Sequence, residues 1–196
     1  MEAAVVVYLR ELFYPEGFHF PLKALPAKLA WIEIGREAST MAMLIAVGMA
    51  AGKSPWSRFS IFILVFGAWD IFYYLWLKIL LGWPSSFLEW DILFLIPLPW
   101  TGPVIAPMIV AACMIYAALE VLYMEKKGLS FTIKKGETVF IALGAAAILA
   151  SFLWDAGIVL NQGVPTKFQW KIFGSGELMG LLAFVQAARR NKARRS

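Results

Sequence analysis

Long runs of apolar residues alternate with short polar stretches along most of the chain. Five of these runs are close to the ~20 residues that an α-helix needs to cross about 30 Å of hydrocarbon. They cover residues 29–51, 59–81, 101–124, 138–160 and 168–188. The pattern therefore predicts an all-α integral membrane protein, a compact bundle of about five transmembrane helices.

Two further apolar segments are too short to cross a membrane. Residues 3–13 predict a short amphipathic helix, within an N-terminal interfacial segment that covers residues 1–28. Residues 90–100 carry two prolines and a tryptophan at each end, which favours a short re-entrant or interfacial segment, with a broken sixth helix as the alternative. Residues 29–188 then form the transmembrane helical domain, and residues 189–196 form a basic cytoplasmic tail.

The composition supports a membrane protein. Hydrophobic residues make up 61% of the 196 residues and charged residues only 16%, whereas a soluble domain carries about 25% charged residues. The single cysteine and single histidine argue against a disulfide framework and against a metal site of clustered Cys and His. We expect no metal, and the sequence names no cofactor.

The basic residues cluster between the apolar runs, and their distribution predicts the topology. Lys53 and Arg58 follow the first run, four lysines lie between residues 126 and 135, and the C-terminal tail is basic. The connection over residues 82–100 contains no Lys or Arg. The positive-inside rule then places the N-terminus outside and the C-terminus in the cytoplasm. This is the pattern of a multi-pass protein of a prokaryotic cell membrane with the lipid bilayer as its partner, and it does not indicate nucleic-acid binding.

Ionisable side chains occur inside the predicted spans, where burial in hydrocarbon costs about 2.5–3.5 kcal/mol each. Such groups usually face the protein interior or a water-filled cavity. With the predicted topology they fall in the outer half of the bundle, and Tyr74 shares a helix face with two of them. We therefore predict an outward-opening polar cavity lined by Glu33, Arg36, Glu37, Asp70, Tyr74, Lys78, Asp155 and Glu177.

Small residues form a face on each of the last two predicted spans. Gly144, Ala147, Ser151 and Asp155 follow helical spacing in the fourth run, and a face that begins at Gly176 follows it in the fifth. Small residues let helix backbones approach closely. The two spans are therefore expected to pack inside the bundle.

Three functions fit this set of residues. The first is handling of a small cation, a proton or a polar solute in the carboxylate-lined cavity. The second is cofactor-independent acid–base chemistry on a lipid or isoprenoid substrate, with Asp70 and Glu177 as candidate catalytic residues. The third is a non-catalytic subunit or assembly factor of a membrane complex, in which the acids only join helices. Transport by so few helices would call for a homo-oligomer.

Overall fold

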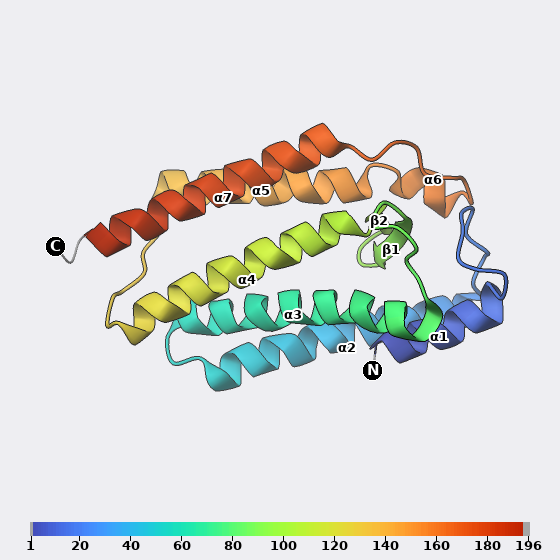
Figure 1. Cartoon of the computed structure of the whole chain (residues 1–196), viewed down its shortest axis with the longest axis horizontal. Coiled ribbons are helices and arrows are strands. Elements are labelled where there is room, and N and C mark those ends of the chain that lie inside the picture. Colours follow the sequence, from blue (N-terminus) through green and yellow to red (C-terminus); the bar gives the residue numbers. More distant parts are fainter. Residues whose placement is uncertain (1, 194–196) are drawn as a thin grey trace. The chain divides into compact units, whose positions relative to one another are not determined.

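The computed structural model describes residues 2–193, and these form mainly helices (Figure 1). Residues 194–196 of the predicted basic tail lie outside the described part of the chain. The elements in chain order are α1 (Glu2–Phe13), α2 (Ala27–Ala51), α3 (Pro55–Leu81), β1 (Trp90–Phe94), β2 (Trp100–Pro103), α4 (Ile105–Lys126), α5 (Lys135–Leu153), α6 (Ala156–Leu160) and α7 (Trp170–Ala193).

Within residues 2–193, three segments are long and apolar enough to cross a membrane. They are Pro55–Leu81, Ile105–Lys126 and Lys135–Leu160, the last of which joins α5 and α6. Large apolar side chains on these segments are exposed, including Phe72, Ile79 and Leu143. Exposed apolar side chains are stable when lipid solvates them, so these helices indicate membrane association. The other two predicted spans correspond to α2 and α7, which contain 25 and 24 residues.

Residues 90–103 form a β-hairpin. β1 and β2 pair in antiparallel order, with Asp91 opposite Gly102 and Ile92 opposite Thr101. The alternative of a broken sixth helix is therefore wrong, and the fold is not purely helical. The prolines at positions 97 and 99 fall between the two strands, where no ladder hydrogen bond is required of them.

The helix predicted over residues 138–160 is interrupted. α5 ends at Leu153 and α6 begins at Ala156, so Asp155 lies in the break. The Asp155 carboxylate accepts hydrogen bonds from the backbone N–H of Thr166, at 2.6 Å, and from the Thr166 hydroxyl. The acid therefore holds the loop that follows α6.

The chain divides into two compact units. The first contains residues up to Thr40 together with Trp69–Ile109 and Phe152–Phe168. The second contains Met41–Ala68 and Val110–Ser151, together with the chain from Gln169 onward. The first unit therefore holds α1 and the hairpin, and the second holds α7.

In the second unit, α5 and α7 approach closely at glycine. A Cβ added to Gly144 would lie 2.6 Å from the carbonyl oxygen of Gly176, and one added to Gly176 would lie 2.7 Å from that of Gly144. The two small-residue faces found in the sequence therefore contact each other at these positions. Close backbone contact of this kind is a common way for membrane helices to associate.

Hydrogen bonds and an ion pair hold the connection between α4 and α5, and the start of α5, against the last turns of α7. The Asn191 amide nitrogen donates to the Thr132 carbonyl at 2.8 Å, and its oxygen accepts from the Thr132 hydroxyl at 2.9 Å. Arg190 forms an ion pair with Glu137 at 2.6 Å. Beside these contacts lies an apolar cluster that includes Met124 and Phe131. Polar and apolar contacts together fix this end of the second unit.

The glycine contact predicts a steric effect of a single methyl group. Gly144→Ala should lower the stability of the detergent-solubilised protein by about 1–3 kcal/mol, because the new Cβ would overlap the α7 backbone. Thermal unfolding measures the change. Gly174→Ala is the matched control, because a Cβ there meets nothing within 4 Å. Equal stability of the two variants would contradict the predicted overlap.

Candidate functional site

The first unit contains a cavity of about 150 Å³. It lies among α1, the segment that follows α1, the first half of α2, the second half of α3 and the strand β1. Aliphatic and aromatic side chains form much of its lining, with Leu9, Phe13 and Phe94 among them. Its charged lining residues are Glu2, Arg10, Lys23, Glu33, Arg36, Glu37, Asp70 and Asp91. The cavity therefore combines apolar surface with charges of both signs.

On α2, three of these charges share one helical face. Glu33, Arg36 and Glu37 are spaced at i, i+3 and i+4, and both glutamates are buried. Arg36 contacts the Glu33 carboxylate at 2.8 Å and also forms an ion pair with Glu2 of α1. The Thr40 hydroxyl donates to Glu2 at 2.6 Å. These contacts hold α1 against α2 and leave Glu2 and Glu33 with cationic or hydroxyl partners.

Glu37 connects α2 to the hairpin. Its carboxylate accepts a hydrogen bond from the backbone N–H of Leu95 at 2.9 Å. Leu95 lies just after β1, where the chain turns toward β2 and no ladder partner takes this N–H. The carboxylate therefore positions the turn of the hairpin at the cavity.

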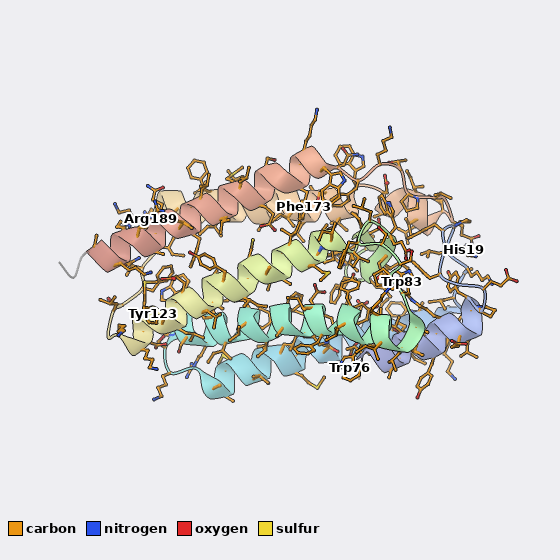
Figure 2. The ribbon with its side chains drawn as sticks, viewed as in Figure 1. His19, Trp76, Trp83, Tyr123, Phe173 and Arg189 are labelled. Carbon is orange, nitrogen blue, oxygen red and sulfur yellow. The ribbon has the colours of Figure 1, made fainter. Side chains whose placement is uncertain are left out.

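Arg10 of α1 and Asp91 of β1 form a buried ion pair with a nitrogen–oxygen distance of 2.9 Å. The guanidinium also lies 3.7 Å from the ring centre of Trp83 and 4.5 Å from that of Phe18. Trp83 is labelled in Figure 2. Burial raises the pKa of the Asp91 carboxyl, and the positive charge of Arg10 acts in the opposite direction. Burial has the larger effect, and Arg10 offsets part of the cost of burying Asp91.

Asp70 and Tyr74 project from α3 and also line the cavity. Tyr74 is buried, and its side chain lies within hydrogen-bonding reach of Asp91. The Oδ2 atom of Asp70 is buried and has no hydrogen-bond partner in the described part of the chain, as is also true of one oxygen each of Glu2 and Asp91. Glu2 and Asp91 nevertheless pair with arginine, whereas the Asp70 side chain forms no ion pair or hydrogen bond within residues 2–193. An unpaired buried carboxylate oxygen costs free energy, since it has lost its hydration without gaining a donor.

Five of the eight predicted site residues therefore line one cavity, namely Glu33, Arg36, Glu37, Asp70 and Tyr74. The other three do not line it. Lys78 donates to the carbonyls of Gly82 and Pro84, and Asp155 holds Thr166. Glu177 belongs to the second unit, where its side chain is close to the Cys113 thiol.

The sequence did not single out four charged residues that line the cavity: Glu2, Arg10, Lys23 and Asp91. Glu2 and Arg10 fall in a helix that was expected to lie at the interface, where charged side chains would face water. Asp91 sits in the 90–100 segment, whose strand pairing was not anticipated. The spacing of the Glu2 and Arg10 positions, 8 apart on one helix, is the only sequence signal that both face the same way.

The buried ion pair predicts a strong effect of Arg10→Met. Asp91 would keep its buried carboxylate without a cation, which should destabilise the protein by about 3–5 kcal/mol. The double variant Arg10→Met, Asp91→Asn should recover much of this loss in thermal unfolding, because no charge remains buried at the pair. Glu11→Gln, at an exposed position of the same helix, is the control. A double variant as unstable as Arg10→Met would contradict the explanation.

Substitution of Asp70 is expected to raise the stability of the protein, whereas Arg10→Met lowers it. Without added ligand, Asp70→Asn should raise the stability by about 1 kcal/mol or more, because the substitution removes a buried charge that has no partner. Glu33→Gln lines the same cavity but breaks the contact with Arg36, and it should lower the stability. Both effects are read from thermal unfolding. If Asp70→Asn lowers the stability of the protein as Glu33→Gln does, the Asp70 carboxylate has a partner within the protein and the prediction is wrong.

The chain was also compared with known proteins. No protein-family model, no curated protein and no solved structure matches it. Its function is therefore argued from the contacts of its own residues.

Proposed function

We propose that the chain is a multi-pass protein of a cell membrane, and that the cavity of its first unit binds a small cation or a polar solute. The observation that carries the proposal is the buried Asp70 Oδ2 atom, which has no hydrogen-bond partner in the described part of the chain. Buried polar groups in native proteins are almost always paired. A bound cation or a hydrogen-bond donor would supply the missing partner.

The charge of the lining favours a positive ligand. Acidic residues outnumber basic ones in the lining, with Glu2, Glu33, Glu37, Asp70 and Asp91 against Arg10, Lys23 and Arg36. A concave, partly apolar site concentrates the field of its charges, because its surroundings screen them weakly. The cavity therefore attracts cations in preference to anions.

Most of the acids that line the cavity already pair with other groups of the protein. Glu2 and Glu33 contact Arg36, Glu37 binds the Leu95 N–H, and Asp91 binds Arg10. These contacts fix the shape of the cavity and leave Asp70 as the group that meets the ligand. In this proposal the paired acids are structural and Asp70 is the binding residue.

The proposal also includes an arrangement of the chain in the membrane. Three segments are long and apolar enough to span a bilayer, and we propose that α2 and α7 complete five spans with the N-terminus outside. The cavity, built from α1 and the adjoining ends of α2 and α3, would then open toward the outer side. Movement of a bound solute across the membrane would require association of several copies.

The alternative is an acid–base enzyme that acts on a lipid or isoprenoid substrate. The aliphatic and aromatic lining of the cavity supports it, because such side chains would accommodate an apolar chain. That reaction was predicted to use Asp70 and Glu177 together, but Glu177 does not line the cavity. The binding function therefore has more support than the enzymatic one.

A cation panel tests the proposal. Purified full-length protein in detergent is heated with sodium, potassium, calcium, ammonium and small organic ammonium salts at matched ionic strength. At least one cation should raise the unfolding midpoint by roughly 5–10 °C when present at about 100 times its Kd. Asp70→Asn should lose this shift, and Glu177→Gln should keep it.

The Glu177→Gln control matters because it removes an acid of the same type from the other unit. A shift that is equal in the original protein and in Asp70→Asn would place binding elsewhere. No shift with any cation in the folded protein would contradict a cation-binding cavity.

A further inference from the structure

The cavity wall already contains one bound cation, which is the side chain of Arg10. Its guanidinium contacts a carboxylate, Asp91, and lies over the faces of two aromatic rings, Trp83 and Phe18. The negative face of an aromatic ring attracts a cation most strongly where water is excluded. The chain therefore shows, in its own side chains, how this part of the molecule stabilises a planar organic cation.

Asp70 shares the cavity with aromatic residues of its own helix, and no cation pairs with it in the described part of the chain. Trp69, Tyr73 and Tyr74 line the cavity together with it, all from α3. The rings of Trp69 and Tyr73 are stacked at 6.3 Å, and those of Tyr73 and Tyr74 meet edge to face at 5.0 Å. Tyr73 and Tyr74 follow Asp70 by three and four positions, so a buried carboxylate oxygen without a partner shares a helix face and a cavity with these contacting rings.

An inorganic ion fits this site less well. Calcium takes six to eight oxygen ligands, and magnesium requires near-octahedral coordination. Within residues 2–193 no group of three or more His, Cys, Asp or Glu side chains is placed to hold a metal ion. Glu33 and Glu37, which could have joined Asp70, are directed to Arg36 and to the Leu95 N–H. Among the acids that line the cavity, Asp70 is therefore the one whose carboxylate pairs with no group of the described chain.

From these observations we propose that the cavity selects a small organic ammonium or amidinium cation with an apolar substituent. The charged group binds the Asp70 carboxylate, and the apolar substituent contacts Trp69 and Tyr73. Lining residues such as Phe13 and Phe94 add further apolar surface to the same cavity. This inference rests on the proposed binding function and names the class of ligand for the same site.

Benzylammonium is the probe, and benzyl alcohol is the neutral molecule of nearly the same shape. Binding to the full chain in detergent is measured by titration calorimetry and by thermal unfolding, alongside sodium, potassium, calcium and manganese. Benzylammonium should bind at least tenfold more tightly than benzyl alcohol, because only the ammonium pairs with the carboxylate. The four inorganic ions should produce no shift that depends on Asp70.

Three variants locate the binding site. Asp70→Asn should weaken benzylammonium binding by about tenfold or more, and Trp69→Leu by about 2- to 30-fold. Trp76→Leu is the matched control, since Trp76 lies on the same helix but is 50% exposed and does not line the cavity. Trp76 is labelled in Figure 2. Trp69→Leu also keeps the test valid if Asp70→Asn alters folding.

The outcomes separate the two proposals. If an inorganic ion binds through Asp70 and benzylammonium does not, the ligand class is wrong and the cation-binding cavity stands. Equal binding of benzyl alcohol and benzylammonium, or a loss in Trp76→Leu as large as in Trp69→Leu, also overturns the ligand class. If no cation of either kind binds to the folded protein, both proposals are overturned.

Discussion

Arg10 and Asp91 form an ion pair with almost no exposure to solvent, and three segments of the first unit meet at it. Arg10 comes from α1, Asp91 from the first strand of the hairpin, and Trp83 from the connection after α3. A buried carboxylate would be strongly destabilising without its cation. The pair thus fixes where α1 and the hairpin lie, and with them two sides of the cavity. Glu2 and Glu37 add a second attachment on each of these two sides, through Arg36 and the Leu95 N–H.

The parts of the fold that follow from local pattern could be predicted from the sequence. Apolar runs of sufficient length located the helices α3, α4 and α5, because such a run forms a helix that is long and apolar enough to cross a membrane. The short helix α1 also appeared where predicted. The hairpin over residues 90–103 could not be predicted, since its strands pair only through contacts between residues that a single apolar run does not reveal. The break at Asp155 likewise depends on a partner, Thr166, 11 positions further along the chain.

The residues of the candidate site could likewise be predicted only where local sequence pattern specifies them. Glu33, Arg36, Glu37, Asp70 and Tyr74 were found because an ionisable group in an apolar helix is costly and helical spacing orients it. Depth in the predicted bilayer suggested that Asp155 and Glu177 would join them, but depth alone does not determine which direction a side chain faces. Arg10 and Asp91 were missed because neither lies in a predicted span. Their importance arises from a contact across 81 positions of sequence, and local spacing carries no information about it.

The contacts of Asn191 with the α4–α5 connection, and of Arg190 with that connection and the start of α5, have a consequence for the order of folding during synthesis. Thr132 and Glu137 leave the ribosome more than 50 positions before their partners in α7, as the sequence separations of 59 and 53 show. At about 5–20 residues per second, that delay is several seconds. During this time the connection must keep its polar groups in water. The synthesis of α7 therefore completes these contacts of the second unit, and an interruption of translation before Arg190 would leave the connection between α4 and α5 without its partners.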